Sequence, residues 1–171
     1  MKRTFITLFA TAALLFAAKV TTDYDHKADF TRYHTYTWMK AEAGSPLWPD
    51  RIKNAVNAEL SKKGLTQGGA ESDLSLTAFG SSHNQPRLTT FYNGFGPGWG
   101  WGWHGFGDTI TYVDEEPVGT LVLDMFDTHD KKLVWRGVAT DSLSDNPDKN
   151  EKKLEHGVAD MFGHFPPKPR G

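Results

Sequence analysis

Cysteine is absent from the 171 residues of this sequence. A chain without thiols cannot form a disulfide, a thiolate metal site or a cysteine nucleophile. Packing and hydrogen bonds alone must therefore hold the fold together. A bacterial lipid anchor also requires a cysteine directly after the apolar part of the leader, so we expect no lipid anchor on this chain.

Neither sign of charge dominates, because 19 Lys and Arg stand against 21 Asp and Glu, for a formal net charge of −2. Proteins that bind nucleic acid or anionic membrane surfaces depend on clustered cations, and we expect no nucleic acid as a partner. The sequence also lacks a nucleophile elbow, a zinc-binding helix and a phosphate-binding loop. We therefore predict no catalytic residues, no cofactor and no metal site.

One long apolar run is present, and it lies at the N-terminus. A basic opening at residues 1–4 precedes residues 5–18, which carry no charge. This is the pattern of a secretory signal, and the run is shorter than the about 20 residues that a membrane-spanning helix needs. We predict that residues 1–19 are a signal peptide, cleaved near Ala17 or Ala18 or else retained as an anchor. The protein is then exported to the periplasm or cell envelope of a Gram-negative bacterium.

Residues 20–167 predict a single α+β domain, followed by a loose tail at residues 168–171. Alternating apolar and polar residues, or runs rich in β-branched and aromatic residues, predict strands. These strands cover residues 20–25, 35–38, 72–79, 88–92, 109–113, 119–126 and 132–140. Polar residues 81–86 predict a turn between two of them, and residues 127–131 predict a hairpin loop.

Two helices are predicted from apolar residues at steps of three and four. The first begins near Trp48 and ends before Gly64, and the second begins after Asn146 and ends at Gly163. Each has a proline in its first turn, where the missing N–H costs nothing. The whole pattern favours a mainly antiparallel β-sheet with two α-helices packed on one face, a two-layer sandwich.

Two blocks of sequence resemble a known family. The first block contains Asp23-Tyr24-Asp25, Ala28-Asp29-Phe30, Tyr33, Thr35-Tyr36 and Trp38. The second contains Gly119-Thr120-Leu121-Val122-Leu123-Asp124, Asp127 and Lys132-Leu133-Val134-Trp135-Arg136-Gly137, followed by a helix that ends in Phe165-Pro166-Pro167. Together they are similar to the domain of unknown function 4136 family of bacterial envelope proteins. The resemblance implies an exported α+β domain, commonly a predicted lipoprotein, without an established activity.

Residues 93–107 form a glycine- and tryptophan-rich loop between two predicted strands. Glycine at alternate positions leaves the backbone little constrained, yet the loop holds three of the six tryptophans. Its aromatic rings can fold back over a groove, seat at a membrane interface, or stack on sugar rings or a partner chain. The candidate binding residues are Trp99, Trp101, Trp103, Phe95, Phe106, His104 and Tyr92.

Other polar clusters carry weaker hypotheses. The hairpin around Asp127 offers oxygen ligands to a hard cation, although aspartates in turns commonly bond their own backbone. Asp23 and Asp25 would share a face of an extended strand, and His156 and His164 fall on one side of the second helix.

We therefore expect a non-enzymatic binding or structural module of the envelope, which contacts a protein, a glycan or the membrane interface. The alternative is an enzyme that acts on cell-envelope material. That alternative requires a pocket in which a carboxylate and a histidine meet.

Overall fold

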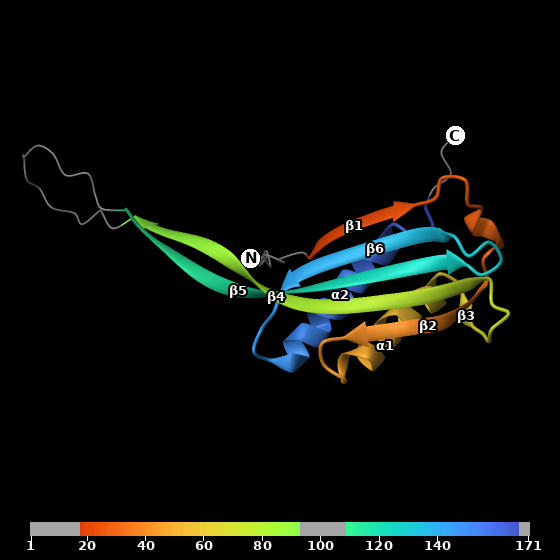
Figure 1. The fold of residues 1–171 in the computed structure, drawn as a ribbon, viewed down its shortest axis with the longest axis horizontal. Helices are drawn as coiled ribbons and strands as arrows, with labels where there is room; N and C mark the ends of the chain where they lie inside the picture. Colours follow the sequence, from red (N-terminus) through yellow and green to blue (C-terminus); the bar gives the residue numbers. More distant parts are fainter. Residues whose placement is uncertain (1–17, 93–108, 168–171) are drawn as a thin grey trace, which may run out of the picture.

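A computed structural model describes residues 18–92 and 109–167. Its elements, in chain order, are β1 (Lys19–Tyr24), the short 3-10 helix η1 (Phe30–Arg32), β2 (Thr35–Ala43), α1 (Trp48–Lys62), β3 (Thr66–Gln67), β4 (Leu74–Tyr92), β5 (Thr109–Asp127), β6 (Leu133–Ser142) and α2 (Pro147–Gly163). The six strands form one sheet in the order β1-β6-β5-β4-β2-β3. Both helices cover the same face of this sheet (Figure 1).

The predicted fold class is confirmed. β1, β6, β5 and β4 pair with one another in antiparallel fashion, and β2 joins β4 and β3 in parallel. The parallel part arises because α1 lies between β2 and β4 and returns the chain to the same end of the sheet. The sheet is therefore mixed, though mostly antiparallel.

The helix ends predicted from capping residues are confirmed. Gly64 has a φ of +84°, and the N–H of Leu65 donates to the carbonyl of Leu60 at 3.0 Å, which closes α1 in the left-handed manner that glycine permits. At the start of α2, Asn146 Oδ1 accepts from the N–H groups of Asp148 and Lys149 at 2.9 and 3.2 Å. This side chain satisfies donors that the helix itself leaves unpaired.

The core lies between the helices and the covered face of the sheet. Large side chains fill it at the end where β4 begins and β5 ends. They include Leu74, Leu76, Leu123, Met125, Trp135 and Phe162, each 1% exposed or less. The ring of Trp135 lies 5.7 Å from that of Phe162 and 5.5 Å from that of Phe165, measured between centroids. No helix within the described ranges is long and apolar enough to cross a membrane.

The predicted turn at residues 81–86 is wrong. β4 runs through these residues without a break, and its register with β5 is continuous from Leu74↔Asp127 to Tyr92↔Thr109. The predicted strands at residues 109–113 and 119–126 are likewise one strand. Residues 81–86 are all exposed. At residues 81–83, β4 is an edge strand beside β5, and residues 84–86 belong to a two-stranded ribbon with water on both faces. Their polar composition therefore matched that of a loop.

The second half of β4 and the first half of β5 leave the body of the sheet together. The pairing of β4 with β2 ends at Gly80, and the pairing of β5 with β6 ends at Val118. Beyond these points the only strand partner of each is the other, and the two project as a ribbon (Figure 1). From Asn84↔Pro117 to Tyr92↔Thr109 the ribbon reaches roughly 25–30 Å, at about 3.3 Å per residue.

Candidate functional site

The aromatic segment predicted as a binding site begins and ends at the tip of this ribbon. Tyr92, the last residue of β4, pairs through its backbone with Thr109, the first residue of β5. The intervening candidates lie outside the described residues: Trp99, Trp101, Trp103, Phe95, Phe106 and His104. The chain therefore enters and leaves the segment at the end of β4 and β5 that lies farthest from the helices.

The hairpin carboxylate of Asp127 has partners within the protein. Asp127 is 3% exposed, and its Oδ2 accepts from the Tyr33 hydroxyl at 2.9 Å. Its Oδ1 accepts from the N–H groups of His129 and Asp130 at 2.8 and 3.2 Å. Burial raises the pKa of Asp127, but these hydrogen bonds outweigh burial and hold the pKa below its usual value. Burial and the same carboxylate raise the pKa of Tyr33 to about 12.

The remaining acidic candidates are also engaged. Asp124 accepts a bidentate pair of bonds from Arg136, at 2.6 Å from Nε and 2.7 Å from Nη2. Asp23 accepts from the N–H of Tyr24, and Asp25 accepts from the N–H of Lys27, both at 2.9 Å. Among residues 18–92 and 109–167, no group of three or more His, Asp or Glu side chains is placed to hold a metal ion. His156 on α2 and His164, the residue that caps its C-terminus, are both exposed.

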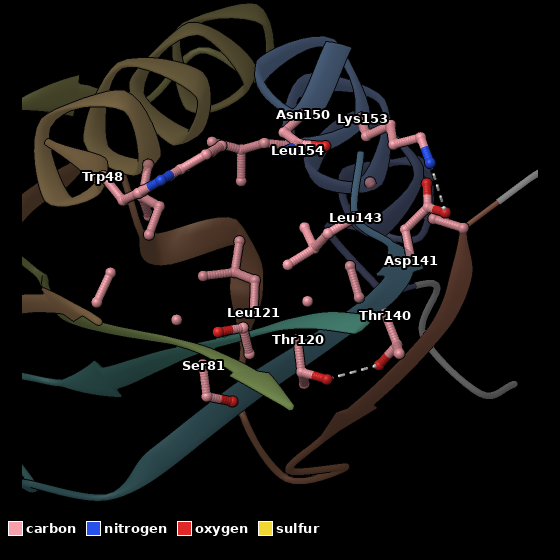
Figure 2. Close-up of a pocket in the computed structure, with 18 of the residues that line it drawn as sticks. Trp48, Ser81, Thr120, Leu121, Thr140, Asp141, Leu143, Asn150, Lys153 and Leu154 are labelled. Carbon is pink, nitrogen blue, oxygen red and sulfur yellow. Dashed lines mark hydrogen bonds and ion pairs between the residues drawn. The ribbon is translucent and has the colours of Figure 1, made fainter. Parts of the chain in front are cut away.

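A pocket of about 370 Å³ lies between the helices and the sheet, at the base of the ribbon. Sequence analysis did not find it. α1 contributes Trp48 and Ile52 to its lining, α2 contributes Leu154 and Gly157, and Ala18 lies on its wall just before β1. Figure 2 shows Leu121 and Leu143 between the sheet and the two helices, with Trp48 and Leu154 above.

The pocket exists because small residues occupy the inward positions at this end of the sheet. Alternation along β4 places Gly80 and Ser82 on the face that carries Leu74 and Leu76. Gly80 pairs with Ala43 on one side and with Leu121 on the other, and Leu121 pairs with Ala139. At the opposite end, the same face carries leucines, a methionine and a tryptophan. The core is therefore full at one end and hollow at the ribbon end.

Two long polar side chains at the edge of the pocket, Lys153 and Asn150, bond to neighbouring groups of the protein. Lys153 Nζ donates to the carbonyl and hydroxyl oxygens of Ser142 at 2.8 and 2.9 Å, and lies 3.6 Å from Asp141 Oδ1. Asn150 bonds the backbone of Ser144 through both its amide oxygen and its amide nitrogen, each at 2.7 Å. The large side chains of the interior are apolar: Trp48, Ile52, Leu121, Leu143 and Leu154.

Thr120 and Thr140 border the pocket on adjacent strands, with their hydroxyl oxygens 3.3 Å apart (Figure 2). Alternation places these two hydroxyls on the face of the sheet opposite to Leu121 and Ala139, away from the pocket interior. No histidine is among the described residues that line the pocket. These lining residues therefore do not form the carboxylate–histidine pair that the enzyme hypothesis requires in a pocket.

A contact between the helices lies beside the pocket residue Trp48. The Arg51 guanidinium lies over the Trp48 ring, with 5.3 Å between its central carbon and the ring centroid. Arg51 Nε also lies 3.4 Å from Glu151 Oε2 on α2. This cation–π and ion-pair contact holds the first turns of the two helices together above the hollow end of the core.

The chain belongs to the family described as "Domain of unknown function (DUF4136)", whose model matches residues 20–167. The resemblance noted in the sequence is therefore confirmed, and membership itself carries no assigned activity. No curated protein matches the sequence significantly.

Solved structures that superpose on this chain come from several bacteria. A PDZ domain protein from Parabacteroides distasonis superposes with a TM-score of 0.61 at 18% identity, over 91% of this chain and 37% of that one. This chain thus spans little more than a third of that protein, and the likeness shows the fold alone. The PelC dodecamer from Paraburkholderia phytofirmans gives a TM-score of 0.47 at 12% identity, over 85% of this chain and 96% of that one. Lipoprotein GNA1162 from Neisseria meningitidis gives 0.42 at 10% identity, over 77% and 99%.

Proposed function

We propose that this protein is an exported cell-envelope module that binds rather than catalyses, and that presents the aromatic segment 93–107 to the membrane interface. The observation that carries the proposal is the ribbon. β4 pairs with β2 only as far as Gly80, and β5 pairs with β6 only from Val118 onward. Beyond these residues the two strands continue together as far as the aromatic segment. A two-stranded ribbon buries little apolar surface and gains little stability by itself, so its length needs another reason. The ribbon would hold the aromatic segment 93–107 away from the sheet and helices, where it can contact another surface, and this accounts for its length.

The position of the N-terminus favours a membrane over other envelope surfaces. Lys19 pairs with Thr140, close to where the pairing of β5 with β6 ends at Val118↔Ser142. The chain therefore enters β1 at the same end of the sheet from which the ribbon departs (Figure 1). The apolar residues 5–18 precede this point directly. An apolar leader and a tryptophan-rich segment at one end of a molecule suit a bilayer, whose interface accommodates tryptophan.

Co-sedimentation tests this function. Protein lacking the residues before Val20 is mixed in parallel with liposomes and with peptidoglycan, beside a variant with Trp99, Trp101 and Trp103 changed to Ala. We expect the native protein to pellet with liposomes and the variant to stay in solution, with both equally folded by circular dichroism. Pelleting with peptidoglycan alone would replace the membrane by a glycan as the surface. Equal pelleting of both proteins with liposomes would contradict a role for the aromatic segment.

A further inference from the structure

We infer that the pocket at the base of the ribbon binds a single hydrocarbon chain of a membrane lipid. The inference deepens the proposed membrane-facing function and relies on it only for the source of the lipid. The site itself consists of residues that the aromatic segment does not include. Binding in the pocket and contact by the aromatic segment can therefore be tested separately.

The interior selects for an apolar ligand. Trp48, Ile52, Leu121, Leu143 and Leu154 supply its apolar surface. The two longest polar side chains at its edge, Lys153 and Asn150, already bond to Ser142 and Ser144 within the protein. A ligand that buries hydrogen-bonding groups against the apolar lining would lose its bonds to water without replacement there, which costs about 1–3 kcal/mol per group. A hydrocarbon chain loses no such bonds on entry.

The size of the pocket limits the ligand to one chain. A volume of about 370 Å³ holds roughly a dozen non-hydrogen atoms, at about 30 Å³ each as for liquid water. That number matches a chain of about twelve carbons, or the corresponding part of a longer one. A lipid with two chains would leave its second chain outside.

The charges at the pocket edge place the lipid headgroup in solvent. The Lys153 ammonium is the only described cation that lines the pocket, and Asp141 lies 3.6 Å from it. Because this pair has no net charge, it offers little attraction to an anionic headgroup. Ala18 and the ribbon base, at Gly80 and Gly119, lie on the same pocket wall. Under the proposed function, this end of the molecule faces the bilayer that supplies the chain.

Tryptophan quenching provides a direct test, because Trp48 lies on the pocket wall. The full chain with Trp99, Trp101 and Trp103 changed to Ala is titrated, without vesicles, with monomeric lysophosphatidylethanolamine whose chain of about twelve carbons carries bromine. We expect saturable quenching, most of which disappears when Trp48→Phe is added. Absence of saturable quenching would overturn the inference.

A matched pair of substitutions separates the pocket from the general surface. Ala43 and Glu42 are the last two residues of β2, and alternation places Ala43 on the helix face and Glu42 on the open face. Ala43→Phe fills the pocket and should weaken binding at least about tenfold, whereas Glu42→Phe should leave it unchanged. If Ala43→Phe does not fold, Ser82→Phe blocks the same cavity from β4. Equal binding by the pocket-filling variant and the Glu42 variant would refute the assignment.

Failure of this inference is distinguishable from failure of the proposed function. Native protein that pellets with liposomes but takes up no lysolipid would retain the membrane contact and lose the pocket assignment. Uptake of lysolipid without pelleting would retain the pocket and refute the membrane contact.

Discussion

At the scale of single residues, the full end of the core depends on a position without a side chain. Gly137 on β6 faces the core, and a Cβ built there would lie 2.5 Å from the Trp135 ring and 2.7 Å from Met161 Sδ. Neither neighbour can withdraw easily, because Trp135 is 1% exposed and Met161 is fully buried. Space at this residue therefore lets α2 pack closely on β6.

Gly137→Ala should consequently destabilise the protein. Overfilling a packed core costs about 1–3 kcal/mol, and we expect the midpoint of urea unfolding to fall accordingly. Gly163→Ala is the matched control, because nothing lies within 4 Å of a Cβ at that position. An unchanged midpoint for the Gly137 variant would show that the core at this end is looser than described.

A second residue, Asp73, ties the start of β4 to the start of β2. Its Oδ2 accepts from the N–H groups of His34 and Thr35, both at 2.8 Å, and from the Thr35 hydroxyl at 2.9 Å. The His34 N–H is the largest cause that lowers the pKa of Asp73 below 3.8, and the two Thr35 donors add to it against the effect of burial. The folded protein therefore releases this proton more readily than the unfolded chain does.

Stability should accordingly depend on Asp73 in acid. The lowered pKa contributes stability that is present above pH 3.8, the unfolded value, and is lost as the pH falls through the folded pKa. One such group changes the free energy of unfolding by at most about 1.4 kcal/mol per pH unit. Urea unfolding between about pH 5 and pH 2 should therefore show a shallower decline in Asp73→Asn than in the native protein. Asp145→Asn, at an exposed site, is the control and should follow the native curve. Parallel curves for all three proteins would exclude this role of Asp73.

At the scale of elements, the ribbon differs from the rest of the sheet. Residues 74–80 of β4 have strand neighbours on both sides, whereas residues 84–92 pair only with β5. Strand pairs without a third strand or a packed face open locally at little cost.

Amide hydrogen exchange should show this difference along single strands. We expect amides of residues 84–92 and 109–117 to exchange at least about tenfold faster than those of residues 74–80 and 119–127, as measured by mass spectrometry at neutral pH. The comparison within one strand is its own control, since both halves share the same solvent and temperature. Uniform protection along β4 would mean that the ribbon is stabilised by more than its own pairing.

The elements also show how far the sequence could predict this molecule. The helix ends were predictable because Asn146 and Gly64 act on the backbone within a few residues of themselves. The two-layer arrangement followed from apolar periodicity. The ribbon was missed because polar residues on both faces of a two-stranded ribbon have the composition of a turn.

The pocket could not be predicted because it depends on several strands at once. Gly80 and Gly119 are small residues at inward positions, but a single strand does not tell whether a neighbour fills the space. The pairing Ala43↔Gly80↔Leu121↔Ala139 brings three small residues into one row. The sequence did carry one signal for the pocket: the alternation of β4 continues past Ala78 and places the small residues Gly80 and Ser82 on the inward face. The expected turn at residues 81–86 ended the strand too early for this signal to be used.

At the scale of the whole molecule, the N-terminal entry, the pocket and the ribbon share one end. The N-terminal entry at Ala18, the pocket and the base of the ribbon all lie where β1 begins. The opposite end carries the hairpin loop between β5 and β6, in which His129 and Asp130 are exposed. Under the proposed function, the molecule therefore meets a bilayer in one orientation, with the ribbon end toward the lipid and the hairpin end in water.

Single labels can test that orientation cleanly, because the natural chain has no cysteine to compete for the probe. Gln85→Cys places an environment-sensitive dye on the exposed part of the ribbon, and Asp130→Cys places it on the hairpin loop. On addition of liposomes, we expect a blue shift and protection from aqueous quenchers at residue 85, and no change at residue 130. Both responses at residue 85 should be lost when the three tryptophans at positions 99, 101 and 103 are changed to Ala. A response at residue 130 alone would reverse the orientation, and equal responses at both sites would indicate adsorption without orientation. A ribbon that positions aromatic residues at the interface must itself approach the lipid. Either result would therefore contradict the explanation that the ribbon is long because it carries the aromatic segment to the membrane.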